Sequence, residues 1–376
     1  MINIFFSKDL IDKNNSENSK LFNSLNKLDN VRLILVSWQI KSASLDTNLF
    51  TLKRTHINVK QFINNHPGRN IFIGNLNQDF FSAVNTKILF LFPEWIINPR
   101  EEKALKYGVH VRNTEHLINM LHIFNNLNTL YYTLPVDELT TVYALTSANN
   151  YGATDDENEV INKFRQVLKE NDKEYLDVIK LTLSSGLSIN PLIQETDIWS
   201  IMPSSGTTLN PTMLDIKDQI RYQYKSKLDT SEEPLLIRHT PTKKSHETPI
   251  FDRLEEGAAK HLSSIHINPY YRDRLKDKNV TILDDYVTNG ISFESIRNLL
   301  ATAGVKKINF IAIGRFTKFS KNNGKGIYQK EDFEITGDIY SPNFSYALKN
   351  KQDIGAFGVY SEEAKHSISL LKDLLI

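Results

Sequence analysis

The chain has 376 residues, of which 40% are hydrophobic and 24% charged, so it is long enough for two or three domains that each bury a core. Its 45 basic and 44 acidic residues leave a net charge of +1, which argues against nucleic-acid binding through bulk electrostatics. The absence of cysteine excludes disulfides and thiolate metal sites. No apolar run reaches the length of a membrane span and the first residues lack the features of a signal peptide, so we expect a cytoplasmic protein without a membrane partner.

The first part of the chain alternates strand-like and helix-like stretches that are joined by short connections. Buried strands are expected at 2–6, 31–37, 71–74 and 87–92. Helical patterns are found at 21–28, 79–85, 101–107 and 115–124. Such alternation is typical of a doubly wound parallel sheet, in which helices cover both faces. We therefore expect a first α/β domain over residues 1–128.

A second alternating block follows a region of mostly helical pattern. Residues 126–180 carry that helical pattern, with a break at 147–158. Beyond it, buried strands are expected at 198–202, 235–237, 280–283 and 308–313. We therefore predict a second doubly wound parallel-sheet α/β domain over 129–330, with a helical lead-in. The remaining segment, 331–376, is expected to pack on that domain and to end in an amphipathic helix.

The most distinctive stretch of the second domain lies at 279–292. Its apolar run ends in two adjacent carboxylates, Asp284 and Asp285, and a small polar loop leads from there into a helical pattern. Such a loop directs backbone N–H groups and a helix N-terminus at one point, which suits a phosphate group. The carboxylates can accept hydrogen bonds from sugar hydroxyls and, with water, hold Mg²⁺. The plainer alternative is an acidic turn before an N-capped helix.

The order Asp-Asp-Tyr-Val-Thr-Asn-Gly-Ile-Ser at 284–292 resembles the signature of the type I phosphoribosyltransferases. Asn289 stands where that family more often has Thr, and its amide still donates a hydrogen bond and tolerates a tight turn. The resemblance implies that Asp284 and Asp285 act in catalysis, hold Mg²⁺ and bind the ribose hydroxyls of phosphoribosyl pyrophosphate (PRPP). By analogy with the family Asp285 is the proton acceptor, although the residues alone do not separate the two. The resemblance also implies a site for the 5-phosphate of PRPP at Thr288, Asn289, Gly290, Ile291 and Ser292.

An enzyme that uses PRPP needs a second anion-binding loop, which receives the pyrophosphate group. Ser204, Ser205 and Gly206 follow the strand expected at 198–202, and their small size lets the backbone approach an anion. These residues resemble the pyrophosphate loop of the same transferases. An ordinary turn is the alternative.

A basic segment, 236–246, lies between the two loops in the sequence. Its Arg238, Lys243 and Lys244 concentrate positive charge in an otherwise neutral chain. The segment is similar to the Arg-x-x-x-Thr segment of the ComF-type branch of the family. That resemblance implies a flexible hood that closes over the pyrophosphate, clamps it and excludes water. The alternative is a solvated basic loop.

The first domain resembles the haloacid dehalogenase (HAD) type of Rossmann-like fold. That family opens with a strand ending in Phe-Phe-Asp-x-Asp, whereas this chain has Phe-Phe-Ser-Lys-Asp at 5–9, with serine in place of the nucleophile. Its fourth motif is matched by Gly-Asn-Leu-Asn-Gln-Asp at 74–79, with asparagine in place of a metal-binding carboxylate. The positions that match the HAD motifs are Ser7, Asp9, Ser37, Asn75 and Asp79.

These two replacements remove groups that the HAD reaction requires. Serine and asparagine cannot form an aspartyl-phosphate or complete a Mg²⁺ site. We therefore expect a degenerate HAD-like domain that keeps the fold without phosphatase turnover and is free to bind a ligand. The lysine of the third motif is either Lys53 or Lys60. A generic α/β domain of another family is the alternative.

Together the two resemblances imply a Mg²⁺-dependent phosphoribosyltransferase joined to a degenerate HAD-like domain. It would transfer ribose 5-phosphate from PRPP to a nucleobase or base-like acceptor and release pyrophosphate. Fused domains of these two kinds resemble parts of bacterial stress-response and defence gene clusters. Two alternatives stay open: a PRPP- or nucleotide-sensing regulatory protein, and a phosphatase that acts through the first domain. Self-association, or a partner protein on the HAD-like domain, is compatible with the sequence.

Overall fold

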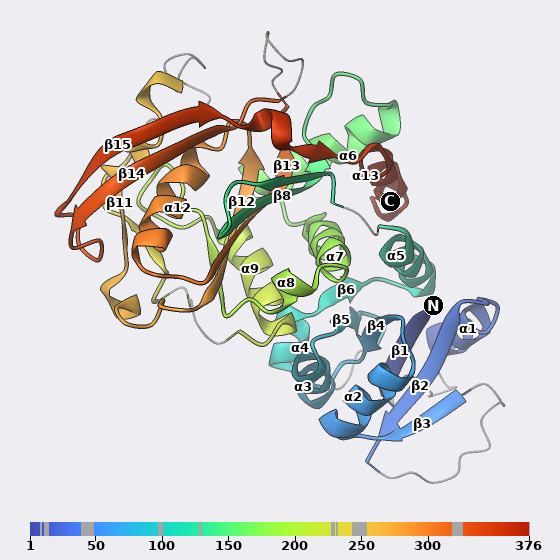
Figure 1. The fold of residues 1–376 in the computed structure, drawn as a ribbon. Coiled ribbons are helices and arrows are strands. Elements are labelled where there is room, and N and C mark those ends of the chain that lie inside the picture. Colours follow the sequence, from blue (N-terminus) through green and yellow to red (C-terminus); the bar gives the residue numbers. More distant parts are fainter. Residues whose placement is uncertain are drawn as a thin grey trace.

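The chain folds into two α/β units that lie one against the other in the computed structural model (Figure 1). The N-terminal unit, in blue and cyan, adjoins a larger unit that runs from green to red, and the C-terminus returns to the boundary between them. The residues that the structure describes are 1–7, 10, 15–38, 49–96, 101–127, 130–226, 230, 232–242, 254–317 and 326–375.

The first unit is built on a six-stranded sheet in which every strand runs parallel to its neighbours. In spatial order its strands are β3 (Leu49–Lys53), β2 (Val31–Ser37), β1 (Ile2–Ser7), β4 (Arg69–Ile73), β5 (Leu89–Pro93) and β6 (Val109–Val111). The order reverses between β1 and β4, so the carboxyl ends of these two strands form the switch point of a doubly wound sheet. The parallel α/β expectation for this unit is confirmed, although β3 and β6 were not predicted.

Helices cover both faces of this first sheet. Residues of α1 (Ser16–Leu25) and α5 (Thr114–Asn126) belong to one buried cluster, on one face of the sheet. A second cluster, on the other face, holds residues of α2 (His56–Asn65), α3 (Asn77–Thr86) and α4 (Glu102–Tyr107). Polar side chains of Asn15, Thr55 and Asn113 cap the first turns of α1, α2 and α5, which explains where these helices begin.

The second unit has a six-stranded sheet of mixed direction. In spatial order its strands are β16 (Val359–Tyr360), β7 (Tyr132–Pro135), β8 (Thr140–Ser147), β13 (Lys307–Arg315), β12 (Asn279–Val287) and β9 (Ile198–Ile201). The four strands from β8 to β9 are parallel, whereas β7 pairs antiparallel with both β8 and β16. The expectation of an all-parallel second sheet is therefore wrong for β7 and β16.

The helical pattern expected at 126–180 is also wrong over the β7–β8 hairpin. The stretch is rich in β-branched and aromatic residues, which favour strands. Strand β8 is buried on both faces along almost its whole length, so it lacks the alternation that would reveal a strand. Helices do follow this hairpin, but α6 begins at Asp155, inside the break expected at 147–158.

Helices also cover both faces of the second sheet. One face carries α6 (Asp155–Arg165), the π-helical segment η2 (Gln166–Glu170), α7 (Leu176–Leu187), α8 (Pro191–Gln194) and α9 (Pro211–Gln223). The other face carries α11 (Ala259–Leu262) and α12 (Ile291–Thr302). Two short strands, β10 (Leu236–Arg238) and β11 (Ile265–Ile267), pair antiparallel beside this sheet.

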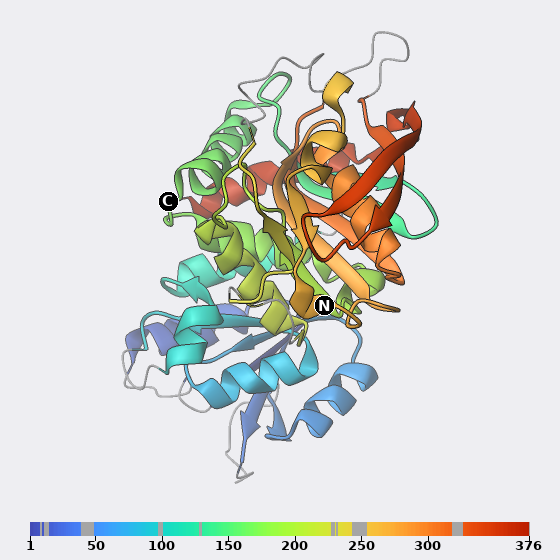
Figure 2. The same cartoon turned by 90° about the vertical axis from the view of Figure 1, so that its left-hand side faces the viewer.

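The C-terminal segment adds a long hairpin and a helical tail. Strands β14 (Gln329–Gly337) and β15 (Phe344–Asp353) form an antiparallel hairpin that was not predicted and that packs on α12 (Figure 2). The expected amphipathic helix is confirmed as α13 (Glu362–Ser367), but its second half is the 3-10 helix η6 (Ile368–Leu374). The tail packs on α5 and α6, at the boundary between the units.

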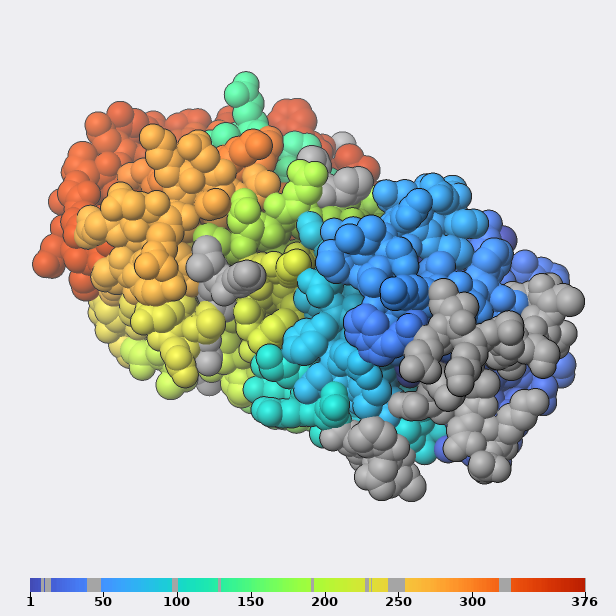
Figure 3. Space-filling view, turned by 90° about the horizontal axis from the view of Figure 1, so that it is seen from below, coloured from blue at the N-terminus to red at the C-terminus, as the bar shows by residue number. Residues whose placement is uncertain are grey.

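The two units share one apolar core. Helix α7 is buried along its length except at Asp177, and a single buried cluster extends from β1 through α5 and α7 to η6. Helices α3 and α4 also contact α9, and the view from below shows the cyan part of the first unit against the green and yellow parts of the second (Figure 3). No helix in the described ranges is both long enough and apolar enough to cross a bilayer.

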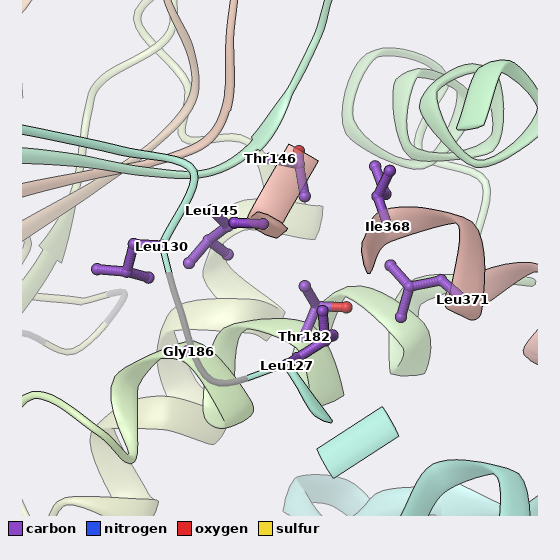
Figure 4. Close-up of a pocket in the computed structure, with 9 residues that line it drawn as sticks. Leu127, Leu130, Leu145, Thr146, Thr182, Gly186, Ile368 and Leu371 are labelled. Carbon is purple, nitrogen blue, oxygen red and sulfur yellow. The ribbon is translucent and has the colours of Figure 1, made fainter. Parts of the chain in front are cut away.

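A small cavity lies where α7, β8 and η6 meet (Figure 4). Its volume of about 10 Å³ would hold one water molecule at most. Leucine and isoleucine side chains make up most of its lining, among them Leu127, Leu145, Ile368 and Leu371. Such an apolar gap is a packing defect between the units rather than a substrate pocket.

Candidate functional site

The pairing of β9 with β12 brings the two predicted loops to the same edge of the second sheet. Ile201 lies opposite Leu283 in the parallel register, and the Met202 N–H donates to the Leu283 carbonyl at 2.8 Å. Because the carboxyl ends of parallel strands meet at one edge, the 204–206 loop begins beside Asp284 and Asp285. We call these two carboxylates the acidic pair.

The acidic pair is half-buried and crowded. Asp284 Oδ1 accepts from the Asp285 N–H at 2.8 Å, and Asp285 Oδ1 accepts from the Tyr286 N–H at 2.6 Å. Burial, followed by the charge of Asp285, raises the pKa of Asp284 well above its ordinary value. Two carboxylates in these positions favour the approach of a cation.

Lys169 supplies one such cation, which the sequence did not single out. Its ammonium forms an ion pair with Asp285 and lies 5.4 Å from the centre of the Tyr286 ring. Lys169 belongs to η2, and π-helical segments are found mostly where a helix is distorted for a function. The side chain is half exposed, so it can leave Asp285 without unfolding the helix.

The 288–292 loop offers unsatisfied hydrogen-bond donors. Helix α12 begins at Ile291 without a side-chain cap, because the preceding residue is Gly290, with φ of 80°. The Asn289 amide nitrogen is buried and has no hydrogen-bond partner among the described residues. Uncapped N–H groups at a helix N-terminus and a buried amide donor are features that suit an anion. Thr288 and Ser292 are half-buried beside them.

The start of β14 holds this loop in place. Tyr328 is fully buried, and its ring fills the space that a Cβ at position 290 would need. The Tyr328 hydroxyl lies 3.0 Å from Glu294 Oε1, and the Gln329 N–H donates to the Asn289 carbonyl at 2.9 Å. Position 290 must therefore be glycine both for its backbone conformation and for its lack of a side chain.

Arg238 links the 204–206 loop to the rest of the site. Its Nε donates to the Ser204 carbonyl and its Nη1 to Ser264 Oγ, both at 2.6 Å. Arg238 is 5% exposed and forms no ion pair with a carboxylate in the described part of the chain. Burial lowers the pKa of Arg238 to about 10, and the nearby charge of Asp284 opposes this effect. A buried guanidinium without a contacting carboxylate can bind an incoming anion.

The structure describes only some of the other residues that were predicted to bind pyrophosphate. Ser204, Ser205 and Gly206 are half-buried, and the Ser205 carbonyl accepts from the Thr242 N–H at 2.8 Å. The segment after β10 therefore lies on the 204–206 loop, where a hood was expected. The predicted clamp residues Lys243 and Lys244 lie outside the described residues.

One side chain that the sequence did not single out, His261, stands between the two loops. Its Nδ1 lies 3.3 Å from Arg238 Nη2 and its Nε2 lies 3.4 Å from Ser292 Oγ. Contacts of Arg238 and His261 thus join the 204–206 loop to the 288–292 loop, and the charge of Asp284 acts on Arg238 without a direct ion pair. These contacts assemble one site from four segments of the chain.

Four of the five positions that match the HAD motifs are described, and they lie at or just beyond the carboxyl ends of β1, β2 and β4. Ser7 ends β1, Asn75 follows β4 and Asp79 lies in α3, and all three are buried. Ser37 ends β2 and is half-buried, whereas Asp9 lies outside the described residues.

A protein cation occupies this first site. Arg54 is buried, forms an ion pair with Asp79 and donates to the Val36 carbonyl at 3.2 Å. Burial raises the pKa of Asp79 and Arg54 opposes the rise. Lys53 and Lys60, the two candidates for the lysine of the third motif, are both exposed. The Arg54 guanidinium thus balances the charge of the Asp79 carboxylate, as a metal ion would.

No group of three or more histidine or acidic side chains in the described ranges is arranged to hold a metal ion. A divalent cation at the acidic pair would therefore need further oxygen ligands from a bound phosphate compound or from water. Comparison with protein-family models gives no match, and comparison with curated proteins gives no significant match.

Proposed function

We propose that the protein is a Mg²⁺-dependent phosphoribosyltransferase that transfers ribose 5-phosphate from PRPP to a nucleobase or base-like acceptor. One observation carries the proposal: Arg238 and His261 join the 204–206 loop to the 288–292 loop, and the pairing of β9 with β12 brings the 204–206 loop to the same sheet edge as the acidic pair. A sugar that carries phosphate groups at both ends needs such an arrangement, with anion-binding groups on either side of a pair of carboxylates.

Each element has a part in this reaction. The α12 N-terminus and the residues Thr288 and Ser292 hold the 5-phosphate. Arg238 and the 204–206 loop hold the pyrophosphate, and Asp284 and Asp285 bind the ribose hydroxyls. As the bond to pyrophosphate breaks, positive charge grows on the ribose ring and the two carboxylates stabilise it. Mg²⁺ held at the acidic pair would help the pyrophosphate to leave.

The geometry of the first site argues against a phosphatase. Ser7 stands where a nucleophilic carboxylate is required, and the Arg54 guanidinium pairs with Asp79. A phosphatase of this kind needs a free carboxylate nucleophile and a divalent cation in that place. The ion pair therefore supports a first unit that keeps its fold without phosphatase turnover.

The proposal predicts the loss of activity when the acidic pair is neutralised. Asp284→Asn combined with Asp285→Asn should lower PRPP-dependent pyrophosphate release by at least about a thousandfold, because charge stabilisation in the transition state is removed. The acceptor is found first, by mass spectrometry of a cell extract incubated with the protein and isotope-labelled PRPP. Circular dichroism checks that the variant is folded.

A matched control is the adjacent pair at the start of α6. Asp155→Asn combined with Asp156→Asn removes the same charge from an exposed helix turn and should leave turnover unchanged. Turnover that survives in the Asp284/Asp285 variant would exclude the proposed mechanism. PRPP binding in titration calorimetry without pyrophosphate release, for every base tried, would instead favour a sensor of PRPP.

A further inference from the structure

His261 is the one described side chain that contacts both Arg238 and Ser292. It comes from α11, a short helix that packs on α12. Arg238 in turn contacts the Ser204 carbonyl. A continuous chain of hydrogen bonds therefore runs from the 204–206 loop to the first turn of α12, and His261 is its central member.

The chemistry of this chain determines where the imidazole proton lies. A guanidinium can only donate hydrogen bonds, so His261 Nδ1 must accept from Arg238. The proton of the neutral ring is therefore on Nε2, which donates to Ser292 Oγ. Burial, followed by the charges of Arg238 and Lys260, lowers the pKa of His261 to about 3. The ring consequently stays neutral, in a single tautomer, at physiological pH.

We propose that His261 is a positioning residue that couples the pyrophosphate subsite to the 5-phosphate subsite. The proposal rests on the function proposed above, because it assigns Arg238 to one phosphate group and Ser292 to the other. An anion bound to Arg238 fixes the guanidinium, the guanidinium fixes the imidazole, and the imidazole fixes the Ser292 hydroxyl. Either anion thus orders the groups that bind the other, so the second anion loses less conformational entropy on binding.

The coupling is measured with inorganic pyrophosphate and ribose 5-phosphate as separate probes, by titration calorimetry on the full chain with Mg²⁺ present. In the unmodified protein, saturation with pyrophosphate should raise the affinity for ribose 5-phosphate about fivefold, and the reverse titration should give the same factor. In His261→Phe the factor should fall to one, because phenylalanine can neither accept from Arg238 nor donate to Ser292.

The conservative variant His261→Gln should retain the coupling that His261→Phe loses. The glutamine amide has one acceptor oxygen and one donor nitrogen, so it can accept from Arg238 and donate to Ser292, and it should restore most of the coupling. A merely structural histidine would not show this pattern. Ser292→Ala removes the hydrogen bond between His261 and Ser292 but leaves the Arg238 contact intact, so it should also abolish the coupling. This variant provides the test if His261→Phe does not fold.

His122 on α5 offers a matched control, since it is exposed and belongs to the first unit. His122→Phe should leave the coupling factor unchanged. A factor of one in the unmodified protein, or an unchanged factor in folded His261→Phe or Ser292→Ala, would overturn the proposal. Turnover of PRPP is assayed separately, so a protein that couples the two anions but lacks turnover would contradict the transferase function alone.

Discussion

The pKa of the Asp284 side chain depends strongly on its surroundings. Its carboxylate is next to Asp285, is partly shielded from water and has Lys169 and Arg238 as the nearest cations. Burial and the like charge both oppose ionisation, and the cations compensate only in part. An acidic pair that costs stability in the absence of a ligand is typical of a binding site.

The raised pKa of Asp284 predicts a pH-dependent gain in stability for Asp284→Asn. At pH 7 the unfolded chain ionises Asp284 more readily than the folded protein does, and this difference disfavours the folded state of the unmodified protein but not that of the variant. We therefore expect the free energy of unfolding at pH 7 to be higher in the variant than in the unmodified protein. The gain should shrink as pH falls through the raised pKa and vanish below the ordinary value of 3.8, where the carboxyl is protonated in both states.

Urea unfolding at several pH values between 3 and 8 measures this difference. Asp215→Asn, at an exposed residue paired with Lys173, is a suitable control and should show little change. A difference between Asp284→Asn and the unmodified protein that does not vary with pH would show that ionisation of Asp284 carries no cost.

At the scale of elements, α12 is the helix that builds the site. A glycine with positive φ precedes it and another follows it, Gly290 with φ of 80° and Gly304 with φ of 75°. Gly304 ends the helix in open surroundings, where the nearest atom to an added Cβ would be Lys276 Cγ at 3.9 Å. Gly290 instead lies against the buried ring of Tyr328. A side chain added at Gly304 would therefore cause backbone strain alone, whereas one added at Gly290 would also overlap with Tyr328.

These surroundings predict different costs for the same substitution. Gly304→Ala should destabilise the protein by about 1 kcal/mol, from backbone strain alone. Gly290→Ala should cost at least about 2 kcal/mol more, because the rigid ring of Tyr328 would have to move. Denaturant unfolding of both variants measures the costs, and equal values would contradict the packing of Tyr328 on the 288–292 loop.

At the scale of the whole molecule, the two units are joined by a common core rather than by a linker. Arg69, on β4 of the first sheet, reaches α7 of the second unit. It donates to the Ser185 carbonyl at 2.7 Å and to Ser188 Oγ at 2.5 Å, and its guanidinium lies 4.0 Å from the centre of the Phe124 ring. Burial lowers the pKa of Arg69 to about 10, which marks a guanidinium that is well shielded from water.

A shared core predicts that the two units unfold together. Calorimetry of the full chain should show a single transition with equal calorimetric and van't Hoff enthalpies. Arg69→Ala should lower the stability of the whole molecule by about 3 kcal/mol, because it removes several hydrogen bonds to Ser185 and Ser188 together with the contact of the guanidinium with Phe124. Arg32→Ala, which removes a contact with Asn3 inside the first unit, should cost less. Two separate transitions would show that each unit is stable alone.

Features that depend on short stretches of chain could be predicted from the residues alone. The alternation of the first 128 residues predicted a parallel doubly wound sheet, and the segment 280–303 was predicted as strand, loop and helix. The parallel sheet and the order of strand, loop and helix are confirmed, since apolar periodicity, glycine and acidic residues act on their near neighbours, but β12 continues through the acidic pair to Val287 instead of ending at Leu283. The same kind of local pattern led to a wrong prediction of helix at β8, because that strand is buried on both faces.

Which distant side chains come into contact could be seen only from the fold. Lys169 is 116 residues from Asp285, and His261 is 31 residues from Ser292. Arg54 and Tyr328 likewise contact their sites from elements that no motif marked. Contacts of this kind depend on how sheets and helices pack, and packing is set by the whole core rather than by any one stretch of sequence. Local motifs therefore identify the acidic and anion-binding residues of the candidate site, whereas the ion pairs and hydrogen bonds between its segments depend on the fold.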